Sequence, residues 1–165
     1  MTTPIAALRV IILPMMLFPI FLLIAIWFVT PDDRFAAVSD STQFVMAGVI
    51  AFSVLAIQFF GYRAAPSPDG ASASQAAADG VVRFRTLTFV RHALAELPLI
   101  AGLAMTFIDS GNGMVPFVLG CVATLGLMVW HVLPNDSQIA KVAAQLESRG
   151  ARVPLREAMY GQLVH

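Results

Sequence analysis

Charged residues are scarce in this chain of 165 residues: Asp, Glu, Lys and Arg together make up 12% of it. Soluble domains carry about 25%. A water-soluble fold of this length would have too few charged side chains to cover its surface, which excludes a typical cytosolic enzyme. Because the formal net charge is +0, no overall basic field favours a nucleic-acid partner.

Cysteine is almost absent as well, and the single Cys121 excludes an internal disulfide framework and a cysteine-based zinc site. The sequence contains no phosphate-binding loop, catalytic triad, zinc-protease motif or redox cysteine pair. We therefore expect no enzymatic activity, no cofactor and no bound metal.

Hydrophobic residues, in contrast, make up 58% of the chain. Four stretches reach the length of about 20 helical residues that crosses a bilayer: residues 10–29, 44–62, 86–108 and 114–133. The apolar run of the first is too long for a signal peptide, so we interpret it as a retained helix. The predicted fold is all-α, a four-helix transmembrane bundle with a cytoplasmic amphipathic C-terminal helix.

Basic residues predict the orientation of these helices. Eight of the ten lie in the N-terminus, the second loop and the tail: Arg9, Arg63, Arg83, Arg85, Lys141, Arg149, Arg152 and Arg156. The first and third loops carry acidic residues and Arg34. Since positive loops stay inside, we expect a multi-pass protein of the cell membrane (the inner membrane, in a bacterium) with both termini in the cytoplasm.

The chain divides into four parts. Residues 1–63 and 84–134 form two predicted transmembrane hairpins. Residues 64–83 between them are rich in Ala, Ser, Gly and Pro, a composition typical of a flexible cytoplasmic linker. Residues 135–165 form a cytoplasmic helical tail, in which Asn135 or Asp136 caps an amphipathic helix and a second short helix starts near Pro154. We expect these helices to lie on the inner leaflet or to bind a partner.

The third apolar stretch contains the candidate functional residues, because the ionisable side chains of Arg91, His92 and Glu96 lie within it. An ionised carboxylate deep in hydrocarbon costs several kcal/mol, so Glu96 must be protonated, paired or in contact with water. His92 and Glu96 are four residues apart and share a helix face, while Arg91 lies on another flank, from which it can reach the headgroups. Pro98, two residues after Glu96, removes an amide donor and frees a carbonyl one turn back, near Leu94.

The run at residues 85–102, RTLTFVRHALAELPLIAG, resembles the second helix of the rotor-ring c subunit of F-type ATP synthases. Both have an arginine at the cytoplasmic entry, an acidic residue eleven positions later, and then a proline and an Ile-Ala-type run. The resemblance implies that Glu96 is an ion-carrying carboxylate. Arg91 and His92 stand at apolar positions of that helix, and the preceding loop is long, so we interpret the match as distant kinship or convergence.

Two functions remain open. Glu96 could be a proton or cation site that His92 and Arg91 tune, with Gln58 as a further hydrogen-bonding neighbour. Alternatively these residues form a structural polar cluster in a non-catalytic membrane subunit or scaffold, which would be a homo-oligomer or part of a larger complex. His92 and His131 could also ligate a haem, but His131 is better interpreted as an interface residue.

Overall fold

The computed structural model describes residues 2–30, 35, 37–68, 70–108 and 113–162. Over these residues the chain is helical and contains no strand. In chain order the elements are α1 (Pro4–Val29), α2 (Asp40–Phe60), α3 (Ala73–Ala95), α4 (Leu97–Ile108), α5 (Val115–Leu127), the π-helical turn η1 (Met128–Val132), α6 (Asp136–Leu146) and α7 (Leu155–Met159).

Polar side chains start most of these helices, because the first backbone N–H groups of a helix lack partners within it. The side-chain oxygens of Thr3, Ser39, Ser72 and Asn135 accept hydrogen bonds from the first turns of α1, α2, α3 and α6. Ser72 is part of a reciprocal capping box with Gln75. The residues before and after the apolar stretches thus define where each helix begins.

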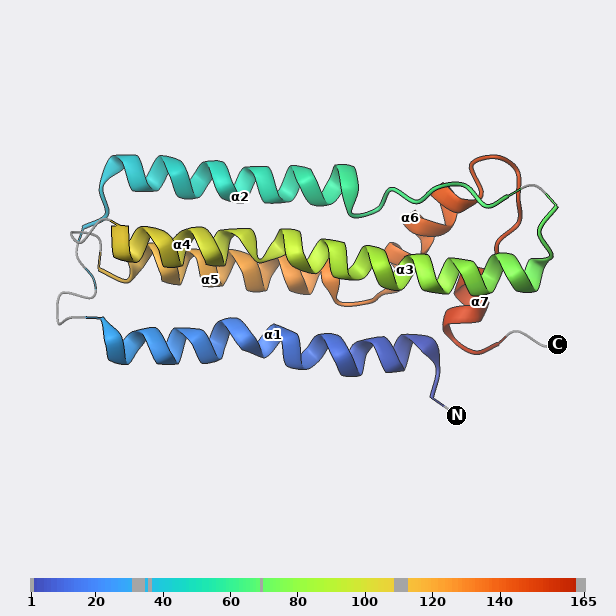
Figure 1. The fold of residues 1–165 in the computed structure, drawn as a ribbon, viewed down its shortest axis with the longest axis horizontal. Coiled ribbons are helices and arrows are strands. Elements are labelled where there is room, and N and C mark those ends of the chain that lie inside the picture. The colour runs from blue at the N-terminus through green and yellow to red at the C-terminus, as the bar shows by residue number, and fades with distance from the viewer. Residues whose placement is uncertain (1, 31–34, 36, 69, 109–112, 163–165) are drawn as a thin grey trace.

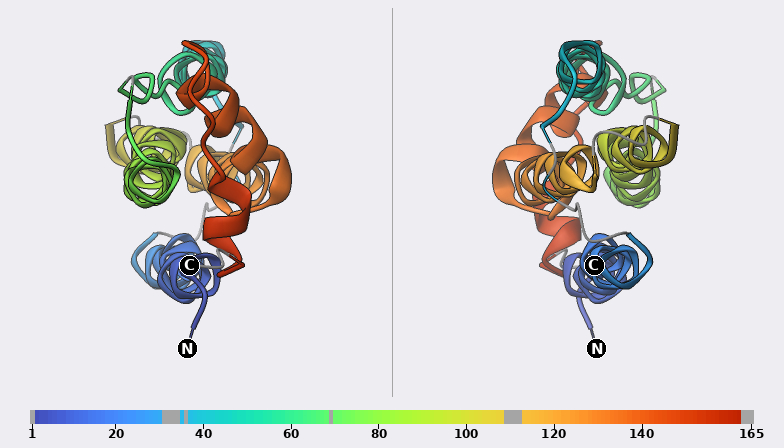
Figure 2. Two further views of the ribbon diagram at one scale, coloured as in Figure 1. Left: turned by 90° about the vertical axis from the view of Figure 1, so that its right-hand side faces the viewer. Right: turned by 90° about the vertical axis from the view of Figure 1, so that its left-hand side faces the viewer.

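The long helices run alongside one another in a bundle (Figure 1). Seen end-on, α2 and α1 lie on opposite sides, with the α3–α4 rod and α5 side by side between them (Figure 2). The start of α1 lies at the same end of the bundle as α6 and α7 (Figure 1), and we name this the terminal end.

Four helical segments are long and apolar enough to cross a membrane: Pro4–Val29, Asp40–Phe60, Ala73–Ile108 and Val115–Val132. Their outer faces expose large apolar side chains such as Phe21, Phe52 and Phe107, which suits hydrocarbon and not water. The predictions of an all-helical fold and of four helices suited to crossing a membrane are therefore confirmed.

The predicted linker needs a correction, because α3 begins at Ala73 and residues 73–83 are helical. Ala76, Ala77 and Gly80 are buried on this helix, and a side chain at Gly80 would touch Leu146, Val153 and Leu155. These small residues let the tail approach α3 closely. Alanine is also the best helix former, so a composition that resembled a linker forms a packed helix once a partner covers it.

The tail folds back onto the chain itself. Leu146 of α6 and Leu155 and Met159 of α7 belong to the main buried cluster, together with Ile5 of α1 and Phe84 of α3. Both predicted tail helices are present, and Asn135 is the cap of the first. Their apolar faces pack inside the protein, whereas a leaflet or an external partner had been expected to cover them.

Candidate functional site

The third span is interrupted at its acidic residue. The α-helix α3 ends at Ala95, Glu96 is its C-cap, and α4 starts at Leu97. Pro98 has no amide hydrogen to donate, and the next amide, that of Leu99, donates to the Thr124 hydroxyl of α5 over 3.1 Å. The interruption is thus stabilised by a side chain of the neighbouring helix.

Two glycines bring α4 and α5 into backbone contact beside this interruption. A Cβ atom at Gly120 would overlap the carbonyl oxygen of Pro98, and one at Gly102 would overlap that of Pro116. Small residues of this kind are what allows membrane helices to pack closely. The backbone around Glu96 is therefore rigidly placed against α5.

His92 and Glu96 form an ion-pair contact within the span. Nδ1 of His92 lies 3.5 Å from Oε1 of Glu96, and the side chain of Glu96 is 30% exposed while that of His92 is buried. Nε2 of His92 has no hydrogen-bond partner among the residues that the structure describes. One ring nitrogen thus faces the carboxylate, and the other is a buried polar atom without a partner among the described residues.

Arg91 is fully buried, at 0% exposure, whereas the side chain of Glu96 is 30% exposed. It donates to the Gly61 carbonyl over 2.9 Å and to the Thr88 hydroxyl over 2.8 Å, and Thr88 in turn donates to Phe84. The prediction that Arg91 extends to the headgroups is therefore wrong: its guanidinium is bound at the end of α2, and a side chain at Gly61 would collide with it.

Aromatic rings surround the guanidinium. Its carbon lies 4.8 Å from the ring centre of Tyr62 and 5.4 Å from that of Phe84, within the range of cation–π attraction. The Tyr62 hydroxyl is 2.9 Å from Nδ1 of His131, and Nζ of Lys141 lies 4.7 Å from the Tyr62 ring centre. We name Arg91, Tyr62, Thr88, Gly61 and His131 the arginine cluster.

The ion pairs of the described residues are His92–Glu96 and Arg156–Asp136, so none of them holds Arg91. Carbonyl and hydroxyl oxygens and ring faces solvate this charge instead. Measured along the helix, Glu96 lies roughly 7 Å beyond Arg91, further from the terminal end. Arg91 and Glu96 therefore lie close together along the helix but form no ion pair with each other.

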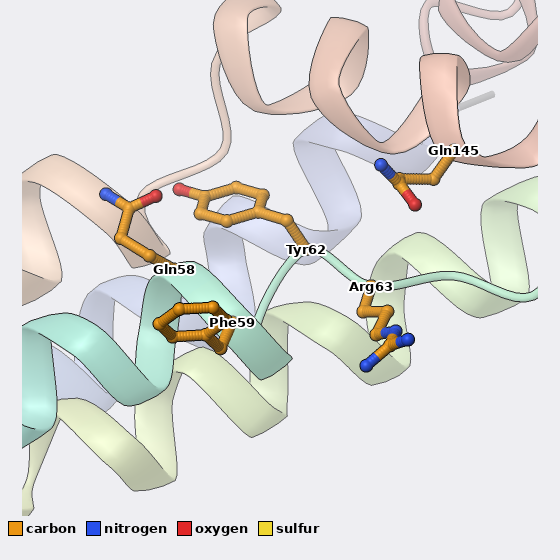
Figure 3. Close-up of a pocket in the computed structure, with 5 residues that line it drawn as sticks. All are labelled: Gln58, Phe59, Tyr62, Arg63 and Gln145. Atoms are coloured by element: carbon orange, nitrogen blue, oxygen red, sulfur yellow. The ribbon is translucent and has the colours of Figure 1, made fainter.

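Gln58, proposed as a hydrogen-bonding neighbour of Arg91 or His92, is exposed at the end of α2. It lines a pocket of about 370 Å³ with Phe59, Tyr62, Arg63 and Gln145. In Figure 3 its amide lies on the same side as the Tyr62 hydroxyl, and the Arg63 guanidinium points away from both. The pocket is at the terminal end, beside the arginine cluster and not beside Glu96.

Sequence reasoning selected Arg91, His92 and Glu96 because charge is rare in an apolar span, and the structure brings the last two together. It did not select Gly61, Tyr62 or Thr88 for this cluster. An available signal was the small residue Gly61 followed by an aromatic residue at the end of the second span, a pattern that leaves room for a large side chain from another helix.

Among the described residues, no three or more His, Cys, Asp or Glu side chains come together as they would around a metal ion. His131 binds Tyr62 and His92 contacts Glu96, so each has a partner inside the protein.

Comparisons of the chain with protein-family models, with curated proteins and with solved structures gave no match.

Proposed function

We propose that this integral membrane protein binds and releases protons at the His92–Glu96 pair in its third span. The observation that carries the proposal is the 3.5 Å contact between Nδ1 of His92 and Oε1 of Glu96. Ionisable residues inside membrane spans usually mark ion or proton sites, because they cost too much free energy to be kept for packing alone.

The charges of the pair explain how a proton is held. Neutral His92 with ionised Glu96 carries one negative charge, and one added proton makes the pair neutral, whichever residue takes it. In surroundings of low dielectric constant the neutral state of the pair is favoured, because it carries no uncompensated charge.

Exposure and backbone geometry support exchange with the surroundings. Glu96 is the more exposed member of the pair, at 30% against 5% for His92, so in the proposed exchange the carboxylate takes the proton first and passes it to the ring. The interrupted helix supports the same function, since broken membrane helices often surround ion sites. The resemblance of residues 85–102 to the ion-carrying helix of the c subunit agrees with Glu96 as the carrier.

Carbodiimide labelling tests the proposal, because hydrophobic carbodiimides modify protonated carboxyl groups in apolar surroundings. The purified protein is labelled in detergent over a range of pH, and the modified carboxylates are located by peptide mass mapping. We expect selective labelling of Glu96 that increases as the pH falls, with a pH profile that shifts in His92→Gln. In proteoliposomes, Glu96→Gln should abolish any proton flux that the wild type supports.

Glu157 provides the matched control, as an exposed carboxylate of α7 outside the spans. Glu157→Gln should leave both the labelling of Glu96 and the proton flux unchanged. If Glu96 stays unlabelled at every pH in folded protein, the carboxylate is permanently paired or inaccessible, and the proposal fails.

A second candidate is a non-catalytic subunit or scaffold of a membrane assembly, and the arginine cluster favours it. Arg91 joins α3 to the end of α2 through Gly61, an arrangement that fixes helix positions. If this alternative is right, Glu96→Gln would change the oligomeric mass or the stability of the protein. The wild type itself would then show no proton flux in proteoliposomes.

A further inference from the structure

A second site lies at the terminal end, where the last span meets α6. A pocket of about 510 Å³ opens there. One part of its lining is apolar and includes Val129 and Trp130, and the other part is polar and includes Asn135, Gln138 and Lys141. Val129 and Trp130 are exposed on the flank of the span, Trp130 at 76%, and the other side is polar. An apolar wall followed by a polar one is what a lipid meets on passing from chain to headgroup.

Gln138, one of the residues that line this pocket, has a side-chain oxygen without a hydrogen-bond partner among the described residues. Its side chain is buried at 2% exposure and lines the pocket, yet its Oε1 has no hydrogen bond among the described residues. A buried amide oxygen without a donor costs free energy, so it calls for a ligand or water in the pocket.

The orientation of this amide follows from the backbone. In a regular helix the carbonyl of Trp130 would accept from residue 134, but that residue is Pro134, which has no amide hydrogen. The chain instead makes a π-helical turn, in which Leu133 bonds to Met128, and Nε2 of Gln138 donates to the Trp130 carbonyl over 3.2 Å. The oxygen of Gln138 is therefore the atom left for a donor from outside.

Lys141 supplies the positive charge. It is the only lysine in the chain, it is exposed on α6, and its Nζ lies 4.7 Å from the Tyr62 ring centre. The acid on the pocket rim, Asp136, is bound to Arg156 at 3.3 Å and to the Tyr160 hydroxyl at 3.0 Å. The ammonium group thus stays available for an anion, and the first turn of α6 adds its positive dipole.

The walls of the pocket are held from two sides. Arg9 of α1 donates to the Pro134 carbonyl over 2.9 Å, and Arg156 and Tyr160 hold Asp136 from the region of α7. The segment between the last span and α6 is therefore fixed by residues from both ends of the chain, and the pocket is preformed.

We infer that this pocket binds the headgroup of a phospholipid that carries a hydrogen-bond donor. Lys141 contacts the phosphate, the Gln138 oxygen accepts from an ammonium or hydroxyl group of the headgroup, and an acyl chain follows Val129 and Trp130. The inference does not depend on the proton site, since no hydrogen bond or ion pair among the described residues joins the lining of this pocket to His92 or Glu96.

Pairs of lipids separate the parts of this inference. The delipidated protein in detergent is titrated with phosphatidylethanolamine, phosphatidylglycerol or phosphatidylcholine of identical chains, and binding is followed by native mass spectrometry. Phosphatidylcholine has the phosphate and no headgroup donor, so we expect it to bind about fivefold more weakly than phosphatidylethanolamine. Equal binding of these two lipids would overturn the role of Gln138.

The unique lysine allows a second readout. Bound lipid should slow the acetylation of Lys141 severalfold relative to the delipidated protein. Inorganic phosphate and glycerol phosphate are the controls for a free anion. If either protects Lys141 as well as the lipid does, the pocket is an anion site and the lipid assignment is wrong.

Variants complete the test. Lys141→Gln removes the charge from an exposed position and should weaken binding of phosphatidylethanolamine and phosphatidylglycerol about tenfold. Arg149→Gln removes the same charge from an exposed residue outside the pocket, and should leave both affinities unchanged. Unaltered binding to Lys141→Gln would refute the site.

Discussion

Arg91 and Glu96 stand five residues apart on one helical rod and are held in contrasting ways. Arg91 is fully buried, with two hydrogen bonds and two ring faces around its charge. Glu96 is partly exposed and has one contact, 3.5 Å long, to His92. A buried charge with several partners holds helices in place, whereas a loosely held carboxylate can change its protonation without disrupting the fold.

The largest effect is expected when the tightly held charge is removed. Arg91→Ala loses both hydrogen bonds and leaves a cavity between α2 and α3, so it should lower the free energy of unfolding by about 3 kcal/mol. Thermal unfolding in detergent measures this. Arg85→Ala, at an exposed position on the same helix, is the control and should change stability by less than about 0.5 kcal/mol. Equal losses in the two variants would mean that burial of Arg91 contributes nothing.

A smaller effect is expected where Glu96 is positioned by the backbone. In Gly120→Ala the added methyl group meets the Pro98 carbonyl, which is backbone and has little room to move, so the protein should lose about 2 kcal/mol. Gly126→Ala on the same helix has open space around the new methyl group. That control should be neutral or slightly stabilising. Similar melting temperatures for the two variants would contradict the close contact of α4 and α5.

An exposed ion pair sharpens the comparison further. Hydrogen bonds from Arg156 and Tyr160 hold the pKa of Asp136 below its ordinary value of 3.8. Its contribution to stability is therefore fully present above that value and is lost as the pH falls through the lowered pKa of the folded state. Thermal unfolding at a series of acidic pH values should show this loss in the wild type.

The variant Asp136→Asn should lack that part of the pH dependence and be slightly less stable at neutral pH. Asp79→Asn, which alters an exposed carboxylate of α3, should keep the wild-type profile. A wild-type profile in Asp136→Asn would show that the pair with Arg156 does not form.

The smallest effect on stability is expected at the proposed proton site itself. Glu96→Gln keeps the size of the side chain and loses only one long contact, so the free energy of unfolding should change by less than about 0.5 kcal/mol. Thermal unfolding of this variant beside Arg91→Ala tests the comparison directly. A loss as large as that of Arg91→Ala would place Glu96 among the structural residues.

Much of this arrangement could be predicted from local sequence. The four apolar runs predicted the spans, and Asn135 marked the start of α6, because length, hydrophobicity and caps act within a few residues. The pairing of His92 with Glu96 followed from their spacing of four residues on one helix. The start of α3 at Ala73 was missed because its buried face consists of Ala and Gly, which look apolar only when Leu146, Val153 and Leu155 cover them.

The sequence by itself determined the helical class, the four helices apolar enough to cross a membrane and the one among them that carries Arg91, His92 and Glu96. Only the tertiary structure decided which of those residues is buried, since Arg91 meets a carbonyl thirty residues earlier in the chain. It also decided that the tail covers α3 and that Gln138, which lines a pocket, has a buried oxygen without a donor among the described residues. The physical reason is that burial and hydrogen bonding depend on residues far apart in the chain, whereas hydrophobic length and helix propensity depend on neighbours.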